Sequence, residues 1–216
     1  MRFRDRRDAG GQLAAALEAL RICGPALVVA IPRGGVIVAD EIARRCGWPL
    51  DIILPRKLRA PGNPELAFGA VAGDGTVYLD ARLARALRVD DAYLRAEIAA
   101  QIAEIARQET RYRDGRAPFD ARGRTAVLVD DGLATGATAI AAVRVLRHRL
   151  ARDVVVAVPV GPPDALRRIE QEADRVICVL QPTAFTAVGG FYEDFTQTTD
   201  DEVTTCLARV WEQKVP

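Results

Sequence analysis

Five short apolar runs, rich in valine and isoleucine, constrain the fold of this chain more than any other feature. The runs lack alternating polar residues, which is typical of parallel strands buried on both faces. Helical patterns lie between several of them, and strand–helix–strand alternation predicts a doubly wound α/β fold with a mainly parallel sheet. The predicted strands are residues 25–32, 49–55, 125–131, 153–160 and 175–180, and the predicted helices are residues 34–47, 136–151 and 164–173.

Residues 79–115 interrupt this alternation with a long helical pattern. Its apolar stripe consists of Leu94, Ile98, Ile102 and Ile105, with Asp90 or Asp91 available as the N-cap and Gly115 beyond the end. We interpret this region as a helical insertion that covers the core beside the sheet. Packing against a second copy of the chain, giving a homodimer, is the alternative. The stretch before it, residues 59–75, is rich in glycine and proline and predicts a loop with one short strand at 66–71.

The size and charge of the chain limit the classes of function that it can have. A length of 216 residues suits a single domain, residues 1–216, and a formal net charge of +1 gives no indication of a nucleic-acid partner. No apolar run approaches the ~20 residues of a membrane helix, and the charged N-terminal stretch lacks the apolar segment of a signal peptide. The four cysteines form no CxxC pair, so we expect buried, reduced thiols in a cytoplasmic protein.

The string "VLVDDGLATGAT", residues 127–138, combines the end of a predicted strand with a loop that opens a helix. Ligands bind outside the carboxyl ends of parallel strands, and a helix start offers free N–H groups to an anion. Thr135 and Thr138 add hydroxyl donors, and Gly136 permits close approach of a phosphate. The loop lacks the lysine of a P-loop, so it suits a phosphate monoester better than a nucleoside triphosphate. Asp130 and Asp131 cannot share one face of the strand, but they can accept hydrogen bonds from two vicinal hydroxyls of a sugar.

This string resembles the phosphoribosyl pyrophosphate (PRPP) motif of the type I phosphoribosyltransferases. The resemblance implies that Asp130 and Asp131 hold the 2′ and 3′ hydroxyls of the ribose. It also implies a cradle for the 5′-phosphate made of Ala134, Thr135, Gly136, Ala137 and Thr138. Taken with "PRGGV", "PRKL", "PGNPELAFGAV" and "YEDFTQT", the likeness is to a subgroup of stand-alone bacterial phosphoribosyltransferases of unsettled substrate, and it covers roughly residues 1–210.

A second loop, "AIPRGGV" at residues 30–36, also follows an apolar run and opens a helix. It resembles the pyrophosphate loop of the same family, in which a non-proline cis peptide is common. Arg33 can meet phosphate oxygens, while Gly34 and Gly35 free the backbone to turn toward them. Residues 55–71 stand where the family keeps a flexible catalytic loop, and there Arg56 and Lys57 could neutralise the leaving group. A solvated basic strand end is the alternative for that pair.

The resemblance implies a pentosyltransferase that displaces pyrophosphate from C1 of PRPP with a nitrogenous acceptor. Mg²⁺ would arrive mainly through PRPP, without a dedicated protein metal site. Residues 183–200 would form a hood over the acceptor, where Phe185, Phe191, Tyr192 or Phe195 could stack on a planar base. Ala134 stands where relatives acting on 6-oxopurines usually carry aspartate, which disfavours such an acceptor. His148 lies among arginines and is interpreted as a surface helix residue. A non-catalytic protein that senses PRPP is the alternative function, although no basic arm or added helix-turn-helix supports it.

Overall fold

The computed structural model describes residues 2–212, except the side chains of residues 64 and 65. Its centre is a parallel sheet whose strands lie in the order β2-β1-β6-β7-β8. All five strands expected from the apolar runs are present, so the predicted doubly wound fold is confirmed. Their bounds are β1 (Ala26–Ala30), β2 (Leu50–Ile52), β6 (Thr125–Val129), β7 (Asp153–Val160) and β8 (Arg175–Leu180).

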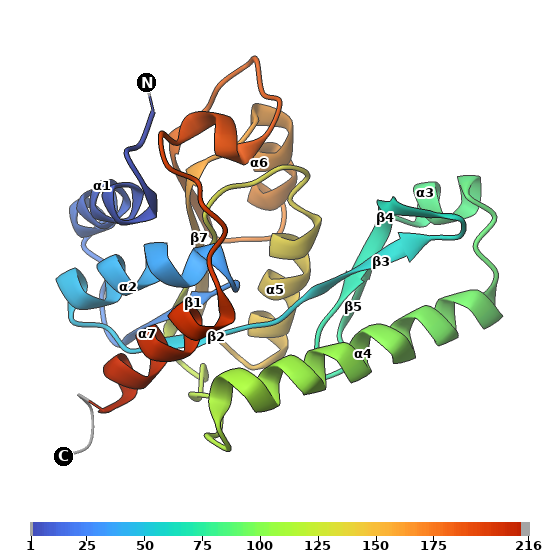
Figure 1. Ribbon diagram of the computed structural model, residues 1–216, viewed down its shortest axis with the longest axis horizontal. Coiled ribbons are helices and arrows are strands. Elements are labelled where there is room, and N and C mark those ends of the chain that lie inside the picture. The colour runs from blue at the N-terminus through green and yellow to red at the C-terminus, as the bar shows by residue number, and fades with distance from the viewer. Residues whose placement is uncertain (1, 213–216) are drawn as a thin grey trace.

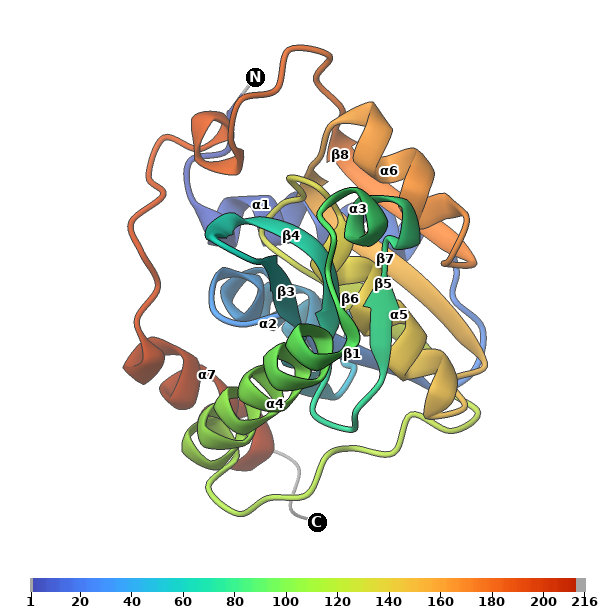
Figure 2. The same ribbon diagram turned by 90° about the vertical axis from the view of Figure 1, so that its right-hand side faces the viewer.

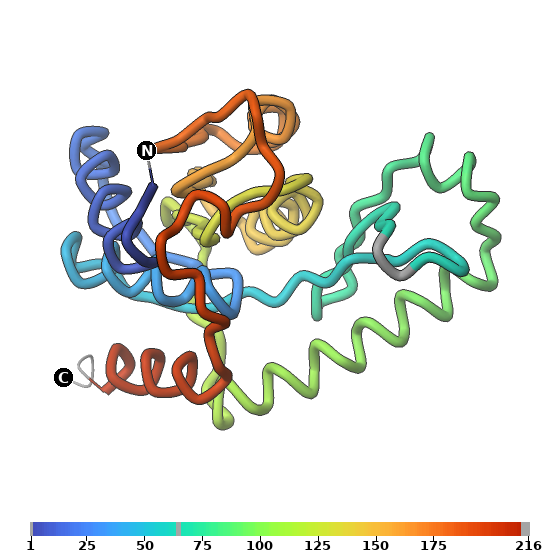
Figure 3. Tube along the Cα trace, turned by 45° about the horizontal axis from the view of Figure 1, so that its top comes forward, coloured from blue at the N-terminus to red at the C-terminus, as the bar shows by residue number. Residues whose placement is uncertain are grey.

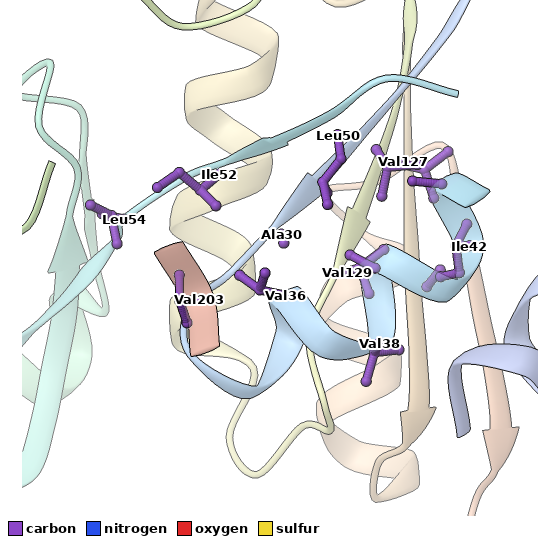
Figure 4. Close-up of a cluster of buried hydrophobic side chains, with 14 of the residues drawn as sticks. Ala30, Val36, Val38, Ile42, Leu50, Ile52, Leu54, Val127, Val129 and Val203 are labelled. Atoms are coloured by element: carbon purple, nitrogen blue, oxygen red, sulfur yellow. The ribbon is translucent and has the colours of Figure 1, made fainter. Parts of the chain in front are cut away.

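Helices cover both faces of this sheet (Figure 1). One face carries α1 (Arg6–Ala19), α2 (Gly34–Cys46) and α7 (Asp200–Glu212), and the other carries α5 (Ala137–His148) and α6 (Pro163–Glu170). Successive strand residues point to opposite faces, so Val28 and Ala30 join one apolar cluster while Leu27 and Val29 join the other. Figure 4 shows the first cluster, in which α2 lies against the strands. The apolar runs are buried on both sides for this reason.

An arm, defined here as residues 56–113, projects from the sheet (Figures 1 and 3). It holds an antiparallel sheet of β3 (Arg56–Ala60), β4 (Asn63–Val71) and β5 (Val77–Leu79), followed by α3 (Ala81–Ala86) and α4 (Asp91–Arg113). The expected strand at 66–71 is present as part of the longer β4, but the expected loop before it is wrong, because β3 and the start of β4 form a hairpin there. Gly62 turns the chain with φ of +72°, and of β3 only Leu58 and Ala60 are buried. A strand that is half exposed and rich in arginine lacks the apolar residues from which a buried strand is predicted.

The long helix α4 forms much as its sequence predicts. The carboxylate of Asp90 accepts a hydrogen bond from the Tyr93 N–H at 2.7 Å, which makes Asp90 the N-cap. Ile105 is fully buried, and Leu94, Ile98 and Ile102 pack partly buried against the same apolar cluster. The stripe therefore covers the arm sheet and the adjoining core.

A buried ion pair fastens the core end of α4 to the central sheet. The Arg113 guanidinium donates to Asp51 Oδ1 at 2.7 Å and to the carbonyl oxygen of Ile52 at 2.8 Å. The backbone N–H of Phe119 donates to the other Asp51 oxygen at 2.9 Å. The two charged side chains are only 7% and 4% exposed. Since β2 lies at the edge of the sheet, this pair joins the arm and the connection after it to the core.

The hood, residues 183–199, is held by the N-terminal segment. Its regular part is the short 3₁₀ helix η1 (Val188–Phe191). The Phe3 N–H donates to the Phe191 carbonyl at 2.9 Å, and the Glu193 N–H donates to the Phe3 carbonyl at 2.8 Å. The ring of Phe3 packs at 5.3 Å from that of Tyr192, and both side chains are buried. Figure 2 shows the hood beside the N-terminus at one end of the sheet.

Two remaining expectations concern the cysteines and membranes. All four thiols are free, but only Cys206 is buried, which corrects the expectation for the other three. Cys46 and Cys178 are half-buried, and Cys23 is exposed. Cys23 lies in the loop before β1, where the chain runs over the surface. Burial raises the pKa of Cys178 and of Cys206 to about 12. Between residues 2 and 212, none of the helices combines the length and the apolar character needed to cross a bilayer.

Candidate active site

The candidate site lies between β1 and β6, where the order in which strands are added across the parallel sheet reverses. β1 and β6 are neighbouring parallel strands, and the helices that follow them, α2 and α5, cover opposite faces. Loops diverging from two such strands leave a crevice at their carboxyl ends, which is where open α/β sheets bind ligands. Both loops expected to bind phosphate groups begin at these ends, at Ile31 and at Asp130. The structure therefore brings together two motifs about 100 residues apart in sequence.

The acidic pair occupies the end of β6. The Asp131 N–H donates to Asp130 Oδ1 at 2.8 Å, which turns the chain sharply out of the strand. Burial raises the pKa of Asp130 well above its usual range, and the neighbouring Asp131 charge raises it further. Burial also raises the pKa of Asp131, although the Arg6 guanidinium opposes that shift. Two adjacent, poorly hydrated carboxylates are well suited to accept hydrogen bonds from hydroxyl groups.

The loop after β1 packs directly against this pair. A Cβ atom built on Gly34 would lie 1.9 Å from Asp131 Oδ2 and 2.6 Å from Arg6 Nε. A Cβ on Gly35 would lie 2.9 Å from the Val129 carbonyl oxygen. Both glycines are thus required by close approach of the two loops. The peptide bond between Pro32 and Arg33 is cis, as is common in the family that the loop resembles.

The loop after the acidic pair opens α5 as expected. Gly136 is the residue before the helix and has φ of +78°, which glycine adopts without strain. The N–H groups of the first turn, which begins at Ala137, have no partner within the helix and face the loop. Thr135 is exposed, and Thr138 is half-buried on that first turn. Ala134 is exposed beside them. These residues can surround a small anion.

A polar cavity of about 300 Å³ lies next to the loop after β1. Arg33 from the core and Arg56 from the arm both line it, together with Gln108, Tyr112 and Asp200. Each arginine has an acidic neighbour, since Asp200 lies 3.9 Å from Arg33 and Glu104 lies 3.8 Å from Arg56. Both distances are longer than a hydrogen bond, so the two guanidinium groups retain donors for an anion. Lys57, the next residue of β3, is exposed on the opposite face of that strand. Arg56 and Lys57 therefore do not act side by side in this conformation.

Tyr112 and Asp200 were not anticipated, and they form one wall of that cavity. The Tyr112 hydroxyl donates to Asp200 Oδ1 at 2.5 Å, while Arg111 pairs with the other oxygen at 2.5 Å. Burial and the Asp200 carboxylate raise the pKa of Tyr112 to about 12. The hydroxyl therefore keeps its proton at neutral pH and remains a donor. No spacing in the sequence connects residues 112 and 200, so the contact was not predictable.

Two side chains from the ends of the chain also reach the acidic pair: Arg6, which belongs to none of the motifs, and Tyr192, which was expected to stack on a base. Arg6 Nε donates to Asp131 Oδ2 at 2.8 Å, and the Tyr192 hydroxyl donates to the Asp131 carbonyl oxygen at 2.6 Å. Tyr192 is buried among Phe3 and Val160, so it serves packing and is not open to a base. The rings of Phe185 and Phe191 stack on each other at 5.5 Å and remain partly exposed. His148 is 74% exposed on α5, away from this site, as expected.

A larger cavity, of about 400 Å³, lies elsewhere, near the amino ends of β6, β7 and β8. Its central cation, Arg152, is already bound to Asp153, to the Thr125 hydroxyl and to the Cys23 carbonyl. The cavity therefore presents a paired cation to solvent. The geometry at the carboxyl ends is the better candidate for chemistry.

Comparison with known proteins bears on the family of the chain. The family model described as phosphoribosyl transferase domain matches residues 24–196. A Mycobacterium tuberculosis protein, whose name gives it only provisionally as a phosphoribosyl transferase, is 48% identical over 208 residues. That match covers 96% of this chain and 46% of the relative, so the chain spans about half the length of the curated relatives it matches.

Two further matches differ in extent. A uracil phosphoribosyltransferase from Bifidobacterium adolescentis is 39% identical over 59 residues, which is 27% of this chain and 28% of that enzyme. The crystal structure of the Thermus thermophilus protein TT1426 superposes with a TM-score of 0.84 at 46% identity. It covers 97% of this chain and 99% of that protein. The similarity therefore includes the arm and the hood as well as the central sheet.

Proposed function

The chain belongs to the phosphoribosyl transferase family, and on that premise we propose that it transfers the phosphoribosyl group of PRPP to a nitrogenous acceptor, releasing pyrophosphate. The observation that carries this proposal is the contact of the two loops. Gly34 leaves so little space that the loop after β1 touches Asp131 of the loop after β6. One ligand with a sugar between two phosphate groups fits a site built from these loops.

In this proposal the two loops divide the ligand between them. Asp130 and Asp131 accept hydrogen bonds from the ribose hydroxyls, and the first turn of α5 with Thr135 and Thr138 receives the 5′-phosphate. The remaining members of that cradle, Gly136, Ala137 and Ala134, contribute backbone and space. Holding both ends of the ligand fixes C1 for attack by the acceptor, which lowers the entropic cost of the reaction.

The departing pyrophosphate would enter the cavity lined by Arg33 and Arg56. Guanidinium groups bind phosphate oxygens through paired hydrogen bonds and stabilise the charge that develops as the C1 bond breaks. The sugar then resembles an oxocarbenium ion, as in glycoside hydrolysis. Lys57, exposed on β3, would reach this charge only after movement of the arm.

Mg²⁺ is the metal that this proposal implies. The donor set fits a hard cation carried by the substrate, since the nearby carboxylates and the diphosphate all offer oxygen atoms. When bound, Mg²⁺ would neutralise pyrophosphate. The chain's own residues would orient the ribose and exclude water beneath the hood.

Ala134 limits the choice of acceptor. It is exposed at the loop that precedes α5, and it offers no carboxylate to a purine ring nitrogen. We therefore expect pyrophosphate release with an adenine-like, pyrimidine or less common heterocycle, and none with hypoxanthine or guanine. A coupled pyrophosphate assay over such acceptors, with PRPP and Mg²⁺ present, measures this. Turnover of a 6-oxopurine would contradict the argument from Ala134.

Substituting either acidic residue is expected to weaken PRPP binding. Asp130→Asn and Asp131→Asn remove a charged acceptor from a ribose hydroxyl, which costs about ten- to a hundredfold in affinity. Isothermal titration of the full chain with PRPP, with and without Mg²⁺, measures the dissociation constants.

The matched control is Asp153→Asn, which changes an aspartate that begins β7, at the opposite end of the strands. Its PRPP affinity is expected to equal that of the unaltered protein. Failure of the unaltered protein to bind PRPP, or equal binding by both site variants, would refute the proposal. PRPP binding without pyrophosphate release from any acceptor would point instead to a PRPP sensor.

A further inference from the structure

Arg6 lies outside the family domain, at residues 24–196, yet it reaches the centre of the site. It is the first residue of α1, where the Asp5 side chain caps the helix by accepting from the Asp8 N–H. The Arg6 side chain is only 11% exposed. A buried guanidinium needs partners for its donors, and those of Arg6 come from two separate parts of the site.

The first partner is the carboxylate proposed to bind ribose. Arg6 Nε donates to Asp131 Oδ2 at 2.8 Å, which is a charge-assisted hydrogen bond. A carboxylate has about four acceptor positions, so this contact leaves capacity for a sugar hydroxyl while it restricts rotation of the side chain. The position of Gly34, whose Cβ would meet both groups, leaves little room for another arrangement.

The second partner is the hood. Arg6 donates from Nη1 to the Thr196 carbonyl oxygen at 2.8 Å, and its guanidinium lies 3.9 Å from the centre of the Phe195 ring. The end of the hood and the ribose carboxylate are thus held by the same planar group. Lysine could not reproduce this, because its single ammonium lacks the fork that makes both hydrogen bonds and stacks on an aromatic ring.

We propose that Arg6 is a positioning residue that sets the Asp131 carboxylate for the ribose and transmits PRPP binding to the hood. This inference rests on the proposed function. Binding of PRPP orders Asp131, which strengthens the Arg6 contacts and with them the anchorage of Phe195 and Thr196. Because linkage is reciprocal, a hood held in place by Arg6 also strengthens PRPP binding.

Two substitutions separate these roles. Arg6→Gln removes the charge, and we expect it to weaken PRPP binding by about tenfold or more. Arg6→Lys keeps a cation near Asp131 but loses the hood contacts, so we expect a smaller loss of affinity, of about threefold. Titration calorimetry with PRPP and Mg²⁺ measures both.

Hydrogen exchange of the hood supplies a readout that a merely structural role would not move. In the unaltered protein we expect PRPP to slow amide exchange across residues 183–199. In both Arg6 variants we expect this PRPP-dependent protection to be lost, including in the lysine variant that still binds PRPP. Arg4→Gln is the matched control, because the Arg4 side chain is 78% exposed and pairs with Asp8 on the surface.

The outcomes are distinguishable. No PRPP binding by the unaltered protein refutes the proposed function, and the Arg6 inference with it. If the unaltered protein binds PRPP, then equal or tighter binding by Arg6→Gln overturns the positioning role. Retained protection of the hood in Arg6→Lys overturns the transmission role. Should Arg6→Gln fail to fold, as judged by thermal unfolding, the lysine variant still decides the second point.

Discussion

Asp51→Ala is expected to lower the free energy of unfolding by about 3–5 kcal/mol. The substitution leaves the Arg113 guanidinium as an uncompensated charge at a position where its side chain is only 7% exposed. The Phe119 N–H would lose its acceptor as well. Arg113 Nε already has no hydrogen-bond partner among the described residues, so the loss of Asp51 would leave a second part of the guanidinium without one. Urea unfolding followed by circular dichroism measures the change.

Two further variants test whether the loss of stability comes from the buried charge that Asp51→Ala leaves unpaired. Asp164→Ala breaks an ion pair with Arg167 in which the aspartate is 79% exposed, and we expect a loss below about 1 kcal/mol. Asp51→Leu combined with Arg113→Met replaces both charges by apolar groups, and we expect much of the loss to be recovered. A double variant as unstable as Asp51→Ala would show that the charge left alone is not the cause.

Gly34→Ala is expected to weaken PRPP binding by more than about a hundredfold. The added methyl group would occupy space now taken by Asp131 Oδ2, at 1.9 Å, and by Arg6 Nε, at 2.6 Å. Both groups must move to admit it, and each lost charged hydrogen bond costs about 1.5–3 kcal/mol. The atoms displaced are side-chain ends rather than backbone, so we expect the fold to persist. Calorimetric titration with PRPP and Mg²⁺ provides the measurement.

Gly11→Ala is the control for this variant. Gly11 lies within α1, and a Cβ there would meet no atom within 4 Å. We expect unchanged PRPP affinity and slightly higher stability, because alanine favours helix over glycine. If Gly34→Ala bound PRPP as tightly as Gly11→Ala, the close contact of the two loops would not be needed for binding.

The central sheet was predictable because its residues carry a strong signal. A strand such as Val154–Val160 within β7 is buried on both faces, so nearly every position is apolar. Helix α2 begins at Gly34 and helix α5 begins directly after Gly136, and the loop sequences before them indicated why glycine is needed there. Local sequence and tertiary environment agree in these segments, which is why pattern reasoning succeeded there.

The strands of the arm and the helices near the two termini were harder to predict from the sequence. β3 exposes Lys57 and Arg59, and its partner across the hairpin begins in a stretch rich in glycine and proline. α1 has two glycines near its start, which weaken its helical pattern. β3 is stabilised by packing against α4, and α1 is stabilised by packing against α2. Such support has no counterpart in a local window of sequence.

Some residues of the candidate site were likewise predicted from the sequence, and others were not. Asp130, Asp131 and the phosphate loop were found because one continuous string holds them. Arg6 was missed because its partner is 125 positions away, and a basic N-terminal segment usually indicates only a solvated surface. The meeting of Arg33 with Arg56 was implied by the family resemblance, but their common cavity depends on how the arm leaves the sheet.

Because α4 is bound to the core at its Arg113 end, a small rotation of the helix displaces its outer end much more than its inner end. The helix of 23 residues is about 34 Å long, and Arg113 and Tyr112 bind it to β2 and α7 at its core end. A rotation of about 10° around that end would carry the outer end about 6 Å, but residues one turn away only about 1 Å. Arg56 is the first residue of β3, where that strand leaves the core, and the β3–β4 turn lies at the outer end (Figure 1). The arm sheet also packs against α5, where the Arg144 guanidinium lies 4.6 Å from the centre of the Tyr78 ring. The inner part of the arm is therefore held at two places, so a small displacement of its outer end leaves the spacing of the two cavity arginines almost unchanged.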